Sequence, residues 1–103
     1  MNPNSLLKLN AALSDRVRLA IMAALATANE PVEFMTLLES LELTRGNLSA
    51  HAQKLEEAGL ISVKKEFVGK KPRTSFSCTD QGRKEIQTYL AQIESVLALV
   101  KKA

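Results

Sequence analysis

The sequence predicts a mainly helical α+β fold in which a β-hairpin follows a pair of short helices and a long helix ends the chain. Three observations predict it. Residues 44–58 begin at Thr44, a good helix N-cap, and precede Gly59, which suits the left-handed turn beyond a helix end. Residues 60–78 contain two β-prone runs around a basic segment with glycine and proline, the pattern of a hairpin. Apolar residues repeat at helical spacing over residues 80–101.

Length and composition predict one globular domain that spans residues 1–103. The chain is 46% hydrophobic and 24% charged, which is ordinary for a globular protein with a modest core. It has no apolar run of membrane-spanning length and no signal-peptide pattern, so we expect a cytoplasmic protein without a membrane partner. The single Cys78 excludes a disulfide framework and a multi-cysteine metal site, and we expect neither metal nor cofactor.

The first part of the chain predicts two helices. Residues 1–5 are expected to be unstructured, and the leucines of residues 6–13 predict a short helix. Ser14 is the expected N-cap of the next helix, which places Asp15 in its first turn, where the helix dipole favours an anion. This second helix is expected to run to about Ala28.

A helix-turn-helix is predicted next. Residues 32–34 alternate and are expected to add a third small strand to the hairpin. Residues 35–41 predict a short helix, and a turn at residues 42–43 leads into the helix at residues 44–58. In this layout the first helix supports the second, which contacts DNA. The complete predicted order is α-α-β-α-α-β-β-α.

The helix at residues 44–58 has one apolar and one polar side. Leu48, Ala52 and Leu55 recur at the spacing of a single buried stripe. A helix that enters the major groove needs small side chains for close approach and hydrogen-bonding groups among them. We therefore interpret it as a DNA recognition helix, although an ordinary solvated amphipathic helix is the alternative. Its outer side carries Gly46, Ala50, Gln53 and Glu57, flanked by Asn47, Ser49 and Lys54.

Positive charge is concentrated in this helix and the hairpin. Residues 44–74 hold seven basic and three acidic side chains, a net charge of +4, although the whole chain has only +3. Such an excess predicts a surface that faces a polyanion. The alternative is a solvated hairpin whose lysines prevent aggregation through its edge.

The hairpin is expected to bury one face and to present a basic loop at residues 68–74. Gly69 provides backbone freedom at its tip, and Pro72 is expected in the loop because it cannot donate a ladder hydrogen bond. We expect Cys78 to be a packed thiol. The residues predicted to share the buried face are Ile61, Val63, Phe67, Phe76 and Cys78.

The last helix has more apolar surface than one domain needs. A helix that covers its own domain buries only one side, so the surplus predicts a partner, most simply a second copy of the chain. Alternatively, residues 6–13 fold back and cover it. Under the dimer hypothesis, residues 14–79 form a core of the helix-turn-helix and the hairpin, which we call the wing. Residues 6–13 and 80–101 form the dimer contact. The candidate interface residues are Leu6, Leu9, Tyr89, Ile93, Val96, Leu97 and Val100.

Four segments of the chain resemble the small winged-helix transcriptional regulators of bacteria and archaea, which are relatives of the MarR and ArsR groups. These segments are Asp15–Ile21, Leu43–Ser49, Leu55–Ile61 and Phe67–Thr74. The resemblance covers about residues 12–100. It implies a homodimer on operator DNA, with the recognition helix in the major groove and the wing near the backbone or minor groove. Metal-sensing members use clustered Cys and His ligands, whereas this chain has one of each.

The resemblance and the helix geometry together name the candidate DNA contacts. Arg45 is expected to contact a phosphate rather than a guanine, because it lies nearer the core side of the helix. Asn47, Ser49 and Gln53 are the candidates for base edges, and His51 for a phosphate. The full set is Thr44, Arg45, Asn47, Ser49, Ala50, His51, Gln53 and Lys54 in the helix, with Lys70, Lys71 and Arg73 in the wing.

Two functions follow from these predictions. The first is a homodimeric transcriptional regulator that binds a specific, palindromic operator in double-stranded DNA. The second is a winged-helix module for protein–protein interaction, which would lack the steep salt dependence of DNA binding. The sequence contains no catalytic constellation in context, so we do not expect an enzyme. A small-molecule effector is left open, because no residues identify a pocket for one.

Overall fold

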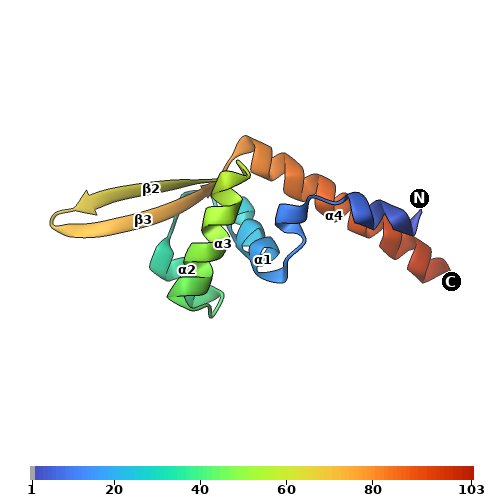
Figure 1. Cartoon of the computed structure of the whole chain (residues 1–103), viewed down its shortest axis with the longest axis horizontal. Coiled ribbons are helices and arrows are strands. Elements are labelled where there is room, and N and C mark those ends of the chain that lie inside the picture. The colour runs from blue at the N-terminus through green and yellow to red at the C-terminus, as the bar shows by residue number, and fades with distance from the viewer. Residues whose placement is uncertain (1) are drawn as a thin grey trace.

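The computed structural model describes residues 2–103 and has the predicted fold class. Among these residues, no helix combines the length and apolar character that crossing a membrane requires. The hairpin and the last helix extend in opposite directions from a central helical body, which gives the molecule extents of 58 × 25 × 22 Å (Figure 1). The elements are the 3-10 helices η1 (Pro3–Lys8) and η2 (Ala11–Leu13), then α1 (Arg16–Thr27), β1 (Val32–Glu33), α2 (Phe34–Ser40), α3 (Arg45–Glu57), β2 (Ile61–Val68), β3 (Lys71–Cys78) and α4 (Asp80–Lys102).

The three strands form one antiparallel sheet in the order β1-β3-β2. The register between β2 and β3 is unbroken from Ile61 opposite Cys78 to Val68 opposite Lys71. Strand β1 pairs with β3 only where Val32 lies opposite Phe76 and Glu33 opposite Ser75. The predicted third strand is therefore confirmed, and it lies at the base of the hairpin.

The hairpin is longer and its loop shorter than predicted. Only Gly69 and Lys70 connect the strands, and the φ of +66° at Gly69 suits a tight two-residue turn. Pro72 lies inside β3, opposite Phe67, and not in the loop as expected. Because β1 ends farther back, β3 has an open edge at Pro72, so the missing N–H need not break a ladder.

The predicted buried face of the hairpin is wrong at Phe67, whose side chain is 75% exposed. Ile61 and Phe76 are buried and Val63 is half-buried, but the end of the hairpin near its turn extends past the helical body (Figure 1). Cys78 is a packed thiol as predicted: Sγ donates to the carbonyl oxygen of Thr79 at 3.4 Å, and burial raises the pKa of the thiol.

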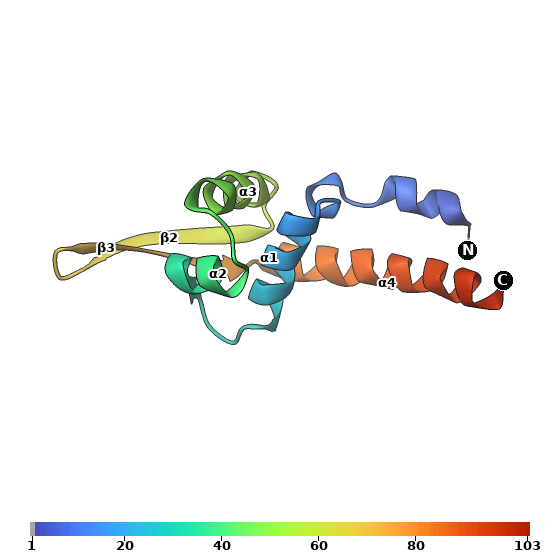
Figure 2. The same cartoon turned by 90° about the horizontal axis from the view of Figure 1, so that it is seen from below.

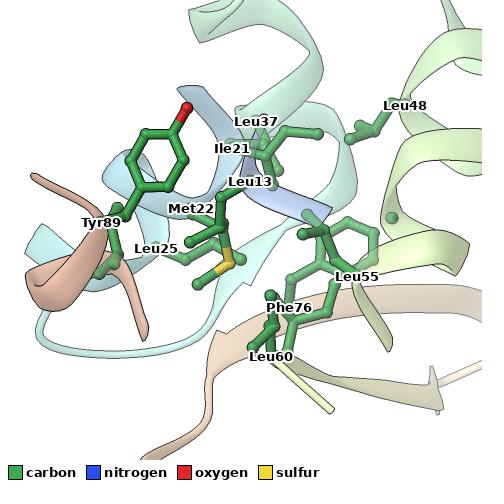
Figure 3. Packing of buried hydrophobic residues seen from close by; sticks show 13 residues of the cluster. Leu13, Ile21, Met22, Leu25, Leu37, Leu48, Leu55, Leu60, Phe76 and Tyr89 are labelled. Carbon is green, nitrogen blue, oxygen red and sulfur yellow. The ribbon is translucent and has the colours of Figure 1, made fainter. Parts of the chain in front are cut away.

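One apolar cluster joins the helices to the sheet. Figure 3 shows its side chains converging from α1, α3, α4 and the sheet. Tyr89, a predicted dimer contact, is only 8% exposed because it packs with Ile86 into the chain's own core, so that assignment is corrected. The cluster comprises Leu13, Ile21, Met22, Leu25, Leu37, Leu48, Ala52, Leu55, Leu60, Ile61, Phe76, Ile86 and Tyr89.

The N-terminal arm, residues 2–13, is two 3-10 turns and not an unstructured start followed by one helix. The carboxamide oxygen of Asn2 accepts from the backbone N–H of Asn4, and that of Asn10 accepts from the N–H of Ala12. Each asparagine thereby begins its own short turn, which prevents one continuous helix. The arm runs beside α4 (Figure 2), and Asn10 Nδ2 donates to Glu85 Oε2 at 3.1 Å. Met1 lies outside the described residues.

Helix α1 is capped by Asp15, and the prediction of Ser14 as its N-cap is wrong. Asp15 Oδ1 accepts from the backbone N–H groups of Val17 and Arg18 at 2.9 and 3.0 Å. Ser14 instead donates its hydroxyl to the carbonyl oxygen of Asn10. The hydrogen bond from the Arg18 N–H holds the pKa of the Asp15 carboxyl below its usual value, because that bond favours the ionised form.

We expect Asp15→Ala to lower the Tm at pH 7 and to have a smaller effect in acid. A carboxyl whose pKa is lower in the folded state stabilises that state above the unfolded pKa of about 4, and this contribution disappears as the pH falls through the folded pKa. Thermal unfolding of both proteins from pH 7 to pH 2.5 measures it. Ser14→Ala is the matched control: it removes only an exposed hydrogen bond of an uncharged group, so any change in Tm should be small and the same at every pH. A Tm difference that persists undiminished at pH 2.5 contradicts the capping role.

Candidate nucleic-acid interface

The predicted capping of α3 is confirmed. The Thr44 hydroxyl accepts from the backbone N–H of Asn47 at 3.1 Å, and Gly59 follows the helix with a φ of +77°. Leu48, Ala52 and Leu55 are buried, as their spacing predicted. These contacts anchor one side of α3 in the core and leave the other side facing outward.

The outer side of α3 is open. Apart from the neighbouring backbone of its own helix, a methyl group added at Gly46 would meet no heavy atom of the described chain within 4 Å. Gln53 makes only a local contact, from Nε2 to Glu57 Oε1 at 3.2 Å. Among the predicted contacts on this helix, His51 is half-buried and the others are exposed, namely Thr44, Arg45, Asn47, Ser49, Ala50, Gln53 and Lys54.

Arg45 extends from the start of α3 toward α2. Its Nη2 lies 3.4 Å from Met35 Sδ, and its guanidinium carbon lies 5.9 Å from the centre of the Phe34 ring. Both contacts draw the guanidinium away from the outermost line of the helix. This placement favours a phosphate partner over a base edge, in agreement with the sequence interpretation.

His51 connects α3 to the first turn of α1. Arg18 donates from Nη1 to His51 Nδ1 at 3.2 Å and from Nε to the carbonyl oxygen of Ala12 at 2.7 Å. Because a guanidinium only donates, a neutral His51 accepts at Nδ1 and carries its proton on Nε2. Asp15 Oδ1 lies 3.9 Å from the same Nδ1. Sequence reasoning missed Arg18, whose pairing with His51 spans 33 positions.

Ion pairs divide the basic residues of the wing into two groups. Arg73 Nη2 lies 2.8 Å from Oε1 of Glu33 in β1, and Lys64 Nζ lies 3.5 Å from Glu66 Oε2. Within the described chain, Lys65, Lys70 and Lys71 are exposed and form no ion pair. The available positive charge of the wing therefore lies on these three lysines, whereas Arg73, a predicted contact, already has a carboxylate partner.

A groove of about 750 Å³ separates α3 from the hairpin. Ser49 and Gln53 approach it from the helix, and Lys65 and Thr74 approach it from the strands. Sequence reasoning missed Lys65 and Thr74, although strand alternation places Lys65 on the same face as Ile61. The complete lining is Phe34, Ser49, Ala52, Gln53, Glu56, Val63, Lys65, Thr74 and Phe76. The outer side of the predicted recognition helix and one face of the wing therefore border the same groove.

A profile described as a winged helix DNA-binding domain matches residues 17–97. An uncharacterised protein of Methanocaldococcus jannaschii is 39% identical over 77 residues, which cover 75% of this chain and 83% of that protein. The solved structure of a transcriptional regulator homologue from Pyrococcus horikoshii is 31% identical, covers 94% of both chains and superposes with a TM-score of 0.84.

A PadR-like transcription factor from Bacteroides fragilis is 19% identical, covers 84% of this chain and 88% of its own, and superposes with a TM-score of 0.71, which shows a shared fold. These descriptions do not support the narrower resemblance to the MarR and ArsR groups. They agree with the expectation that the chain is not an enzyme. The matched profile spans most of the chain, and the protein belongs to the winged helix DNA-binding domain family.

Proposed function

We propose that this protein is a cytoplasmic transcriptional regulator that binds operator DNA as a homodimer. Helix α3 enters the major groove, and the wing contacts the neighbouring backbone or minor groove. The observation that carries the proposal is the groove that the polar side of α3 shares with the lysine-bearing face of the wing. The description of the Pyrococcus protein as a transcriptional regulator homologue supports it, at 31% identity over nearly the whole chain.

In this proposal the contacts divide by what they recognise. Asn47, Ser49 and Gln53 are exposed along the outer side of α3 and provide hydrogen-bonding groups for base edges. Phosphate contacts position the helix without recognising sequence, and they come from the side chains around this centre. That set is Thr44, Arg45, His51, Lys54, Lys65, Lys70 and Lys71.

The exposed apolar seam of α4 supports a dimer. Leu90, Ile93, Leu97 and Val100 are 43, 39, 47 and 65% exposed, although their spacing continues the buried position of Ile86. The N-terminal arm covers only part of this helix, since Val96 and Leu99 are half-buried and Leu6 is itself 37% exposed. A two-fold contact between two copies of this seam would bury it and would impose a palindromic operator, with half-sites about 10 base pairs apart.

Selection of bound duplexes from a random pool tests this function. We expect an enriched site with two-fold symmetry, and binding to it should weaken steeply with salt because displaced counterions return to the phosphates. A pool that shows no enrichment over the input contradicts sequence-specific binding. Binding of a partner protein through α4 that does not depend on salt would instead favour the protein-interaction alternative.

Ile93→Glu combined with Leu97→Glu is expected to convert the dimer to a monomer. Both side chains are partly exposed within one chain, so the new carboxylates spare the monomer core but must be buried in a two-fold contact, which is strongly unfavourable. Sedimentation equilibrium measures the mass, and Gln87→Glu on the same helix is the control. A double variant with the parent's mass contradicts the proposed interface.

A further inference from the structure

The wing ends in an exposed apolar pair. Phe67 is 75% exposed, and it lies directly opposite Pro72 in the β2–β3 register. Side chains of directly opposed residues leave a sheet on the same face, so the ring and the pyrrolidine lie side by side. The pair lies outside the apolar core, and most of the Phe67 ring is exposed to solvent in the isolated chain.

Strand alternation places this pair on the face that looks toward the recognition helix. Lys65 and Thr74 are the next pair on the same face, and both line the groove shared with α3. Pro72 itself lines a smaller hollow together with Arg45, at the beginning of α3. By strand alternation Val68 lies on the opposite face. Arg73 alternates with Pro72 as well, and it borders both this hollow and another one beside Asn29 and Pro31. The apolar pair therefore lies on the side of the hairpin that borders α3.

Unpaired cations surround the apolar pair. Lys65 lies two residues closer to the body on the same face, and Lys70 lies in the turn. Lys71 is adjacent to the turn, opposite Val68 on the other face of the hairpin. An apolar surface among lysines matches the DNA minor groove, where deoxyribose walls lie between two rows of phosphates. At a strand spacing of about 3.3 Å per residue, Phe67 lies about 13 Å beyond Val63, so it can pass the phosphate strand that borders the major groove.

We propose that Phe67 and Pro72 form an apolar wedge that enters the minor groove of A·T-rich DNA beside the major groove occupied by α3. The inference rests on the proposed DNA-binding function and adds a specificity-determining contact to it. The preference for A·T pairs follows from the guanine 2-amino group, which projects into the minor groove of G·C pairs and obstructs an apolar side chain.

The wedge is tested by measuring how tightly the parent and the Phe67→Ala variant bind three duplex polymers at low salt. The polymers have alternating A·T, alternating G·C and alternating I·C sequences. Inosine lacks the 2-amino group, so I·C resembles A·T in the minor groove and G·C in the major groove. We expect the variant to bind A·T and I·C about tenfold more weakly than the parent, because burial of the aromatic ring is lost. Binding to G·C and the salt dependence on every polymer should be unchanged, since no charge is removed.

Val68→Ala is the matched control, because it removes exposed apolar surface at the same end of the wing but on the opposite face. It should leave binding to all three polymers unchanged. Equal losses for Phe67→Ala on all three polymers, or no loss on A·T and I·C, overturn the wedge. A parent that binds none of them overturns the DNA-binding proposal as well, whereas a binding parent with an indifferent Phe67 overturns the wedge alone.

Fluorescence provides a second measurement. The chain contains no tryptophan, so Phe67→Trp introduces a single indole at the tip. We expect its emission to change strongly on addition of the A·T or I·C polymer, as the indole leaves water, and weakly on addition of G·C. An emission that is the same with and without a bound A·T duplex overturns the wedge.

Discussion

Replacing Lys65, Lys70 and Lys71 together by glutamate is expected to weaken duplex binding at least about 100-fold at physiological salt. Each lysine that neutralises a phosphate contributes about 0.9 to the slope of log affinity against log salt, so the variant should also lose about 2.7 from that slope. All three side chains are exposed and unpaired within the described chain, so the fold should survive. Fluorescence anisotropy of a labelled, selected duplex across a salt series measures both quantities.

The control reverses the same number of charges on α4, which extends away from the wing. Lys84, Lys101 and Lys102 are exposed on α4, and their replacement by glutamate changes the formal net charge equally. We expect this control to lose much less affinity, because charges beyond a Debye length of about 8 Å from the DNA are screened. Equal losses in the two variants contradict a localised contact at the wing. Parental affinity in the wing variant contradicts DNA binding through this surface.

Gly82→Ala is expected to lower the free energy of unfolding by about 3 kcal/mol or more, the upper range for overpacking. Gly82 lies in the first turn of α4, where an added methyl group would overlap the carbonyl oxygen of Leu60 and lie 3.1 Å from Met22 Cε. That carbonyl oxygen accepts from the Thr79 N–H at 3.1 Å, and the Thr79 hydroxyl accepts from the Gly82 N–H at 2.9 Å. These hydrogen bonds hold the backbone at both Leu60 and Gly82, so the overlap can be relieved only if α4 moves away from Leu60.

The better helix propensity of alanine does not offset this overlap, because it is worth at most about 1 kcal/mol. Gly46→Ala in α3 is the matched control: its methyl group meets nothing, so the stability should stay the same or rise by up to about 1 kcal/mol. Urea denaturation of both variants measures the difference. A Gly82→Ala protein with the parent's midpoint would contradict so close an approach of α4 to Leu60.

The sequence predicts a helix end correctly where the contacts that determine it are local. Thr44 is recognisable from the sequence because an N-cap bonds only to the first turn of its own helix. Ser14 was chosen over Asp15, since both residues can cap and only the path of the chain from η2 decides which side chain faces the free N–H groups. The assignment of Tyr89 to a partner failed for a similar reason: periodicity cannot distinguish the chain's own core from a second copy.

In the candidate site, the sequence determined the helix, its outward polar side and the basic hairpin behind it. The first two follow from a period of 3.6 residues per turn and the third from turn-forming residues between β-prone runs. The tertiary structure alone decided which charges are available. Glu33 pairs with Arg73 only because β1 joins the sheet beside β3, and Phe67 is exposed only because the hairpin extends beyond the helices. Both depend on contacts between residues distant in the chain, which local patterns do not encode.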